Sequence, residues 1–339
     1  MQYSITKNIP SVFVVTSPFQ ALCAIAAIRQ FEIEDYKFIV AIHAASLDRK
    51  GQLLNILFVF QLKYELIYLD RIDFHKYRIK SFLLRKNRYK NVFIGDLRFP
   101  IMLYIGLAYS TYNANVICLD DGNATIAFLK TNENKLYKSV LDKCVLKSLS
   151  FIRGVDFPKI FCTVYCGLSS SRYKISNLKL SFLTSQILTQ PYDDVVYFIG
   201  TNNTSFCAEL GFQESWYYAK LSEILKMIST KHKASKIYYI AHGRDDGNIT
   251  KQICEKKQIT FVRPNSTIEL FALEHKPPKY VYGFTSSALY NLKQMYPSSE
   301  VINILFDALN TDANNEYRII SDYYLQNGIH MVNEKLVEQ

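Results

Sequence analysis

The feature of the sequence that most constrains its fold is a regular alternation of short apolar runs with longer amphipathic segments. Runs rich in β-branched and aromatic residues predict strands, and the segments between them have helical spacing. Such an alternation is typical of parallel sheets joined by right-handed crossovers, so we expect an α/β fold. In the first half of the chain the predicted strands are Ser11–Thr16, Lys37–Ile42, Leu66–Leu69, Asn91–Ile94 and Asn115–Leu119, with helices such as Phe19–Phe31 and Gln52–Gln61 between them.

The same alternation starts again near residue 195. One hydrophobic core rarely grows beyond about 250–300 residues, so a chain of 339 residues with two such patterns predicts two doubly wound domains. We place them at 1–188 and 189–310, and we expect 311–339 to form a helical tail that packs back on the body. The later strands are predicted at Val195–Ile199, Lys236–Ala241, Thr260–Arg263, Tyr280–Phe284 and Val301–Ile304, the last closing the sheet, and the helices at Glu214–Lys231, Ile249–Lys256, Ile268–Glu274, Ser286–Met295 and Asn314–Tyr324.

Polar residues follow four of the predicted strands. Taken singly, each group is most often a turn, a helix cap or a structural histidine. Two Rossmann-like domains that face a central cleft would bring the C-terminal strand ends together, however, and ligands of such sheets bind there. The four groups are Asp120-Asp121-Gly122, His242-Gly243-Arg244, Glu269 and Thr285-Ser286-Ser287.

The chemistry of these residues fits transfer from a nucleotide-activated sugar. The hydroxyls and free backbone amides of Thr285, Ser286 and Ser287 at a helix N-terminus favour a phosphate. Glu269 could accept hydrogen bonds from ribose hydroxyls, and His242 could donate to the departing phosphate oxygen.

The first domain would supply the remaining group. A carboxylate there could take the proton from an acceptor hydroxyl. Gly122 permits close approach of the backbone at that point. We therefore expect the Asp120-Asp121-Gly122 segment to serve the acceptor.

This ordered set resembles the motifs of bacterial sialyltransferases of the two-domain GT-B type, which have an acidic-acidic-glycine, a histidine-proline and a serine-serine motif. The stretches "YYIAHGRDD" and "YVYGFTSSALYNL" are most similar to the lipooligosaccharide sialyltransferase family, glycosyltransferase family 52. The opening "VVTSPFQALCAI" is similar to that family's first strand, turn and helix, with Gln20 as the matching polar residue. The resemblance runs from about Val12 to Leu309.

The resemblance implies an inverting, metal-independent transfer of sialic acid from CMP-sialic acid, without a cofactor, to a terminal sugar hydroxyl. Galactose on a lipooligosaccharide, O-antigen or capsule is the implied acceptor. Asp121 matches the general base, His242 the residue that contacts the CMP phosphate, and Glu269 a ribose or cytidine contact. Ser286 and Ser287 match phosphate-binding serines, with Thr285, Gly243, Gly122 and Gln20 in supporting contact, Asp120 as an orienting or capping carboxylate, and Arg244 beside the histidine.

Two positions depart from the family pattern. Gly243 replaces the motif proline, which loosens the strand end beside His242. Asn202-Asn203 stands where lipooligosaccharide enzymes have a carboxylate that is assigned as base. Neutral asparagine cannot act as a base, so either Asp121 does that work or the chain differs in donor, acceptor or activity.

The net charge of +10 favours an anionic partner. The segment His75–Asn91 has seven Lys or Arg and no acid, so we expect either a solvated face or peripheral contact with an anionic inner-membrane surface, where lipid-linked acceptors reside. Nucleic acid is not expected, and a homodimer stays open. Seven cysteines without a CxxC pair, and no uncharged run of about 18 residues, favour a cytoplasmic protein.

Two other functions remain as alternatives. One is a transferase that uses another CMP-nonulosonate or a different nucleotide sugar. The other is a noncatalytic protein that binds membranes or nucleic acid through its basic face, in which case Asp121 and His242 would be dispensable.

Overall fold

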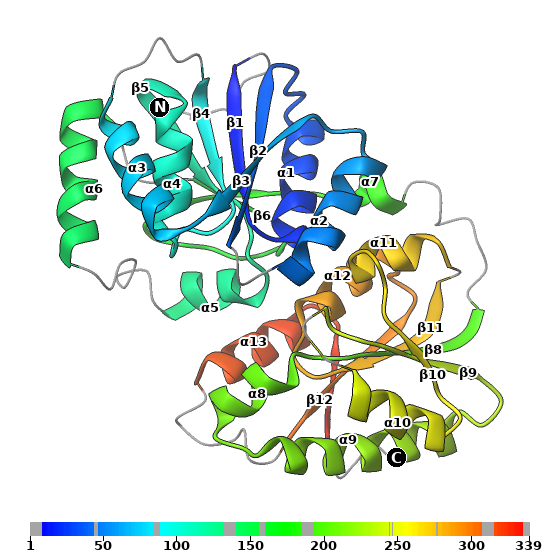
Figure 1. The fold of residues 1–339 in the computed structure, drawn as a ribbon. Coiled ribbons are helices and arrows are strands. Elements are labelled where there is room, and N and C mark those ends of the chain that lie inside the picture. The colour runs from blue at the N-terminus through cyan, green and yellow to red at the C-terminus, as the bar shows by residue number, and fades with distance from the viewer. Residues whose placement is uncertain are drawn as a thin grey trace. The chain divides into compact units, whose positions relative to one another are not determined.

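A computed structural model describes residues 9–43, 47–83, 89–131, 140–155, 160–184, 193–243, 245, 247–275, 277–306 and 315–334. The chain divides into two compact units, Met1–Leu180 and Ser181–Gln339. Each unit contains one parallel sheet with helices on both faces (Figure 1). The division falls eight residues before the boundary placed after residue 188, and the second unit includes the segment expected as a helical tail.

The sheet of the first unit has the order β3-β2-β1-β4-β5-β6-β7, and all its pairs are parallel. Five of its strands were predicted, and the structure adds the short β6 and β7. Its strands are β1 (Ser11–Val15), β2 (Tyr36–His43), β3 (Tyr64–Leu69), β4 (Tyr89–Ile94), β5 (Ser110–Cys118), β6 (Ile160–Thr163) and β7 (Lys174–Asn177).

The helices of this unit begin where the sequence supplies caps. Ser17 accepts from the amide of Gln20 at the start of α1, where Pro18 takes the first helical position, and Asp70 accepts from the amide of Asp73 at the start of α3. Figure 1 shows α1 and α2 on one face of the sheet and α3, α4 and α6 on the other. The helices are α1 (Pro18–Gln30), α2 (Leu47–Val59), α3 (Arg71–Phe82), α4 (Pro100–Ala108), α5 (Asn123–Thr131) and α6 (Val140–Arg153).

The second unit has the sheet order β10-β9-β8-β11-β12-β13. The prediction that Val301–Ile304 closes this sheet is wrong, because β13 pairs with β12 on its outer side, from Ile302 to Leu305. The strands are β8 (Asp193–Ile199), β9 (Lys236–Ile240), β10 (Thr260–Val262), β11 (Pro278–Gly283), β12 (Glu300–Leu305) and β13 (His330–Asn333). The helices are α7 (Ser181–Thr184), α8 (Asn203–Leu210), α9 (Glu214–Lys231), α10 (Asn248–Lys256), α11 (Ile268–Leu273), α12 (Ser287–Met295) and α13 (Asn315–Gln326).

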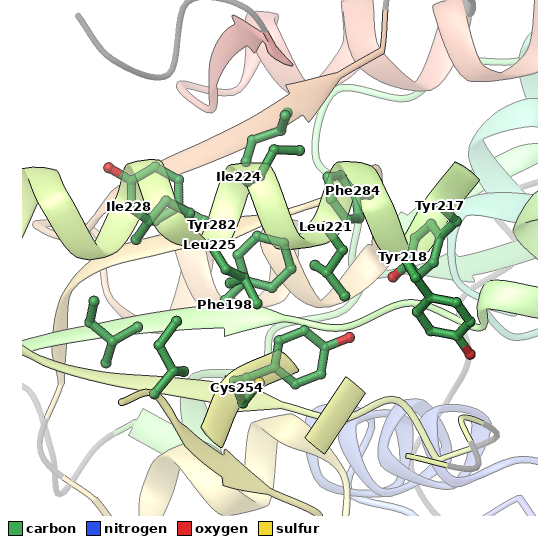
Figure 2. Close-up of a cluster of buried hydrophobic side chains, with 14 of the residues drawn as sticks. Phe198, Tyr217, Tyr218, Leu221, Ile224, Leu225, Ile228, Cys254, Tyr282 and Phe284 are labelled. Atoms are coloured by element: carbon green, nitrogen blue, oxygen red, sulfur yellow. The ribbon is translucent and has the colours of Figure 1, made fainter. Parts of the chain in front are cut away.

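The core of the second unit lies between α9 and the sheet. Figure 2 shows Leu221, Leu225 and Ile228 on the side of α9 that faces the strands, above Phe198 of β8. These positions recur at helical spacing, so one continuous stripe of α9 is buried. Phe284, which directly follows β11, packs in the same cluster. The packing of Phe284 in the core therefore anchors the strand end that leads into α12.

Both sheets reverse their strand order at one point, between β1 and β4 in the first and between β8 and β11 in the second. Ligands of open α/β sheets bind outside the C-terminal strand ends at such a reversal. The polar strand-end residues are therefore to be sought beside these two places. In the described part of the chain, we find no helix with both the length and the apolar character needed to cross a bilayer.

Candidate functional site

The carboxylate of Asp121 lies just past the end of β5 and is held through both oxygens. Gln20 Nε2 donates to Asp121 Oδ1 at 2.7 Å. Gln20 Oε1 in turn accepts from the amide of Thr16 at 2.8 Å and from its hydroxyl at 3.1 Å. The glutamine therefore links the end of β1 to the end of β5, and its amide group can have only one orientation.

A guanidinium group holds the other oxygen. Arg98 Nη2 forms an ion pair with Asp121 Oδ2 and another with Asp96 Oδ2 at 2.7 Å. Arg98 Nε also donates to Asp96 Oδ1 at 3.0 Å. Both residues follow β4, so three neighbouring strand ends contribute side chains to one cluster.

The electrostatics of this cluster place a proton-accepting group near neutral pH. Burial and then the Asp96 carboxylate raise the pKa of Asp121 to about 7, against the opposing effects of Arg98 and Gln20. The pKa of Arg98 is above its usual value, since its two carboxylate partners outweigh burial. The Asp121 side chain is still 28 % exposed, so a substrate hydroxyl can reach it.

Asp120 has a different environment from its neighbour. It is fully buried, and its Oδ2 accepts from the amide of Val164 at 2.6 Å, which ties β5 to the end of β6. Burial raises the pKa of Asp120 to about 7 as well. The contact that the structure shows for Asp120 is therefore structural. The role of an orienting carboxylate suits it.

Two glycines make the cluster possible. Gly122 has a φ of 68°, the left-handed conformation that a turn directly before α5 requires and that other residues rarely adopt. A Cβ on Gly95 would lie 2.1 Å from Gln20 Oε1, so any side chain there would displace Gln20. Beside the carboxylate is a cavity of about 20 Å³ lined by Asp96, Arg98 and Asp121. It has room for a group of about the size of one water.

Sequence reasoning found Gln20, Asp120, Asp121 and Gly122 but missed Asp96 and Arg98. Gly95-Asp96 follows the predicted strand Asn91–Ile94 and met the same strand-end criterion as the other groups. That signal could have identified Asp96. The pairing of Arg98 with Asp121 has no sequence signature, because it depends on the adjacency of β4 and β5.

In the second unit, the junction of β11 and α12 is built on a strained backbone. Thr285 has a φ of 34°, which is unfavourable for a β-branched residue. Its amide donates to Asn303 Oδ1 at 2.5 Å, from the buried interior of β12. Ser286 caps α12 by accepting from the amide of Ala288 at 3.4 Å, and its own carbonyl accepts from the Tyr324 hydroxyl at 2.8 Å.

Strain of this kind persists only where surrounding contacts impose it, and it concentrates at ligand sites. The helix that follows, with Ser287 as its first residue, has nine residues and directs its N-terminal amides past this turn. Such an end attracts anions through its free amides and the helix dipole. The local geometry therefore suits the phosphate contact predicted for Thr285, Ser286 and Ser287.

Glu269 is fully buried at the start of α11, contrary to the usual solvated carboxylate at a helix start. Its Oε1 accepts from Asn291 Nδ2 of α12 at 2.6 Å. Burial raises its pKa, and the Asn291 hydrogen bond opposes this. Asn291 was not predicted, and it connects Glu269 to the helix that begins at the serine pair.

His242 lies two residues beyond β9, which is separated from β11 in the sheet by β8. Its carbonyl accepts from the amide of Asp245 at 3.0 Å. Asp245 is buried and accepts from the amide of Gly247 at 2.9 Å, so this short turn is internally organised. Gly243 lies within it, and Arg244, which was predicted to support the histidine, is outside the described residues.

The Asn202-Asn203 pair has a carboxylate beside it. Asn202 caps α8, and Asn203 Nδ2 donates to the Tyr218 hydroxyl at 2.6 Å and to Glu214 Oε2 at 3.4 Å. Thr204 also donates to Glu214, at 2.8 Å. Glu214 begins α9, eleven residues after Asn203 along the chain, so only the folded structure reveals it as a second candidate acid or base.

No metal centre emerges from the residues that the structure describes, since no three His, Cys, Asp or Glu side chains gather there as ligands would. The candidate site is therefore a pair of strand-end constellations. One is built on Asp121 in the first unit, and the other on Glu269 and the start of α12 in the second.

Comparisons with known proteins give no matching family model and no match among curated sequences. Solved structures do match. The α/β-galactoside α-2,3-sialyltransferase of Photobacterium phosphoreum has a TM-score of 0.52 at 14% identity, over 96% of this chain and 99% of that one. The 2,6-sialyltransferase of Photobacterium sp. JT-ISH-224, in complex with CMP and lactose, has 0.51 at 13% identity, over 95% and 78%.

A structure with a different named activity is equally similar. A protein of Listeria monocytogenes described as a UDP-N-acetylglucosamine 2-epimerase has a TM-score of 0.55 at 11% identity, over 95% of this chain and 89% of that one. At such identities the likeness concerns the fold. Together with the two parallel α/β sheets, it confirms the predicted fold class: this chain has the GT-B fold.

Proposed function

We propose that this chain is an inverting sialyltransferase that moves sialic acid from CMP-sialic acid to the hydroxyl of a terminal galactose. The observation that carries the proposal is the Asp121 carboxylate, which is partly exposed, held by Gln20 and Arg98, and raised in pKa to about 7. A general base works best when its pKa is near the operating pH. The motif order and the GT-B fold support the choice of reaction.

Asp121 can take a proton although both of its oxygens are engaged. Each carboxylate oxygen accepts through two lone pairs, and Gln20 and Arg98 each use one. One further lone pair therefore remains on each oxygen, and either can accept from an acceptor hydroxyl. The two fixed donors orient these lone pairs, so the acceptor oxygen meets a base of defined direction.

The proposed reaction is a single displacement. The acceptor oxygen forms the new bond to the anomeric carbon as its proton passes to Asp121, and the bond from that carbon to the CMP phosphate breaks. The leaving phosphate gains negative charge, which the N-terminal amides of α12 and the His242 side chain stabilise. Attack from the side opposite CMP inverts the anomeric centre. No metal or cofactor has a step in this scheme.

The donor is assigned to the second unit. There, Thr285, Ser286 and Ser287 offer hydroxyls and amides for the phosphate, and Glu269, held by Asn291, is assigned to the ribose or cytidine. The sialyltransferase crystallised with CMP and lactose supports this general kind of donor and acceptor. A lipid-linked acceptor, a product on lipooligosaccharide, O-antigen or capsule, membership of family 52, a cytoplasmic location and a homodimer stay predictions.

A donor screen tests the proposal. The purified chain is incubated with a lactose acceptor and CMP-sialic acid, another CMP-nonulosonate, or UDP- and ADP-sugars, and products are read by mass spectrometry. We expect a sialylated product only with CMP-sialic acid. A product only with another nucleotide sugar would move the assignment to the alternative donor class, and an inert chain that still binds CMP would contradict transfer to galactose.

Two matched variants identify the base. Asp121→Asn should retain CMP binding by calorimetry and lose about 10²–10⁴-fold in kcat. Glu214→Gln should retain turnover if Asp121 is the base. The opposite result, with wild-type turnover in Asp121→Asn and loss in Glu214→Gln, would transfer the role to Glu214 beside Asn203.

A further inference from the structure

The solvent side of α3 has a row of apolar residues where a surface helix would ordinarily be polar. Ile72, Ile79 and Leu83 are 76%, 63% and 50% exposed. They are spaced by seven and four residues and so lie in one stripe, with Lys76 between them. The opposite side of the helix packs inward in the normal way, with Tyr77 and Ser81 buried.

The neighbouring helix α6 has the same character. Phe151 is 91% exposed, the most exposed large apolar side chain in the described part of the chain, and Ile152 is 48% exposed. Lys143 and Lys147 precede Phe151 at intervals of four residues and are also exposed. The outer side of α6 is therefore a stripe of two lysines that ends in a phenylalanine.

The two helices form a single surface because their side chains hold them together. Arg78 Nη2 of α3 lies 3.7 Å from Asp142 Oδ1 of α6. The buried Arg153 at the end of α6 donates to the Ser81 carbonyl at the end of α3, at 2.7 Å. Figure 1 shows both helices on the same side of the first sheet. We call this surface, defined by Ile72, Ile79, Leu83, Lys143, Lys147 and Phe151, the α3–α6 face.

The net charge of this face is positive, although the exposed Asp70 caps the start of α3. The acidic residues of the two helices are Asp73 and Asp142, and each is paired with a base, Asp73 with Lys76 at 3.2 Å and Asp142 with Arg78. Exposed Lys143 and Lys147 therefore leave the face positive. The chain continues from Leu83 into a stretch that includes three more basic residues, which lies outside the described residues.

We propose that the α3–α6 face docks on a lipid bilayer that contains anionic lipids. Helices that lie in a membrane interface combine isoleucine, leucine and phenylalanine with lysine, and the long lysine side chains reach the headgroups while their stems stay in apolar surroundings. Ile72, Ile79 and Leu83 are aliphatic and offer no ring on which a base could stack, so most of the exposed apolar surface suits acyl chains rather than a single-stranded nucleic acid. The positive charge complements anionic headgroups.

Vesicle sedimentation tests the proposal with the intact chain. Phosphatidylcholine vesicles with and without a third of phosphatidylglycerol are compared, and we expect at least tenfold tighter binding to the anionic ones. Ile79→Ser with Phe151→Ser, and separately Lys143→Glu with Lys147→Glu, should each weaken that binding at least tenfold. All four residues are exposed, and circular dichroism should show unchanged thermal unfolding.

The control pair lies on α10 in the second unit, where Ile249 is 45% exposed and the side chain of Lys251 is 61% exposed. Ile249→Ser with Lys251→Glu removes a similar apolar tip and reverses a similar charge, and it should leave vesicle binding unchanged. Equal loss in both pairs would show that net charge alone drives adsorption and would overturn the proposal.

Two other occupants are tested with the same variants. If the Ile79→Ser and Phe151→Ser variant kept full vesicle binding but lost affinity for single-stranded RNA, the face would belong to nucleic acid. If it converted a dimer to a monomer in sedimentation velocity, the face would belong to a second copy. Either result would overturn membrane docking. None of these readouts depends on sialyl transfer.

Discussion

Gln20 and Asp121 are joined by a 2.7 Å hydrogen bond between residues that are 101 positions apart in the chain. The glutamine has no freedom to turn, because its oxygen already accepts from the amide of Thr16. The hydrogen bond therefore fixes the position of the carboxylate and favours its ionised form. From this relationship follow consequences for rate and for pH dependence.

Gln20→Leu should lower kcat/KM by about tenfold, because a fixed hydrogen bond to a charged group contributes roughly 1.5–3 kcal/mol when made. CMP binding should not change. The matched control is Gln30→Leu at the other end of α1, where the exposed side chain donates to the Asn177 carbonyl instead. Comparable losses in both variants, measured by initial rates, would argue for a general effect on α1.

The pH profile should report the raised pKa of Asp121. A base with a pKa of about 7 is protonated and inactive below that pH, so kcat/KM should rise tenfold per pH unit up to about pH 7 and then level off. Initial rates between pH 5 and 9, with protein stability checked at each pH, measure this rising limb of the kcat/KM profile. A profile already flat from pH 5 upward would disprove the raised pKa.

Arg98→Met should move that limb to higher pH. The guanidinium lowers the pKa of Asp121, and removing it leaves the carboxylate beside Asp96 without a cation. We expect a shift of about one unit or more, since an adjacent opposite charge changes a carboxylate pKa by roughly 1–3 units. Arg98→Lys keeps a cation beside Asp121, so its pH profile should shift less than that of Arg98→Met. A lower maximal rate with an unmoved limb would mean that Arg98 serves only to position the carboxylate.

Asp120→Asn should stabilise the protein at pH 8 and not at pH 4. The carboxyl has a pKa of about 7 when folded and 3.8 when free, so folding binds a proton between these values. Stability from this group is therefore greatest at low pH, falls as pH rises from about 4 to about 7, and is constant above. The penalty of keeping it charged is at most on the order of 4 kcal/mol. Urea unfolding at pH 4, 6 and 8 measures it.

The reason for expecting stabilisation is that asparagine retains an oxygen for the Val164 amide and carries no charge. Destabilisation of equal size at every pH would show that the native protein keeps Asp120 ionised through contacts stronger than its burial. The companion Asp121→Asn should stabilise less, because it also loses the ion pair with Arg98.

Asn303→Ala should weaken CMP binding while changing kcat little. The side-chain Oδ1 of Asn303 accepts from the backbone amide of Thr285. Without it, the strained turn before α12 loses the contact that maintains the φ of 34° at Thr285. We expect CMP affinity to fall by about tenfold, together with about 1–3 kcal/mol of stability from the unpaired buried amide. Calorimetry with CMP and urea unfolding measure the two effects.

Much of the architecture could be predicted because long apolar periodicities determine it. The helix Glu214–Lys231 was placed at its observed ends, and ten strands were located because each is apolar and bounded by turns. The strands β6, β7 and β13 were missed. Each has only four residues, and their pairing is decided by neighbouring strands rather than by propensity.

The residues of the candidate site also fall into those that a local pattern predicts and those that only the folded structure reveals. Asp121 and Ser286 could be found because they end strands. Asn291 and Asn303 could not, because a buried asparagine within a helix or strand shows its importance only through a partner, here Glu269 and Thr285. No local pattern in the sequence indicates that the Glu214 carboxylate accepts from the Asn203 side chain. These contacts depend on tertiary adjacency, which no local pattern encodes.

The sheet order of the second unit has a consequence for biosynthesis. The first unit ends at Leu180 and contains all of its own strands, so it can fold while the remainder is still being translated. The second sheet lacks the outer partner of β12 until residue 333 has emerged. The 28 residues from the end of β12 at Leu305 to the end of β13 at Asn333 take about 1–6 s at ~5–20 residues per second. During that time the nascent chain exposes an unpaired β12 edge, which makes the unit's late synthesis its most aggregation-prone stage.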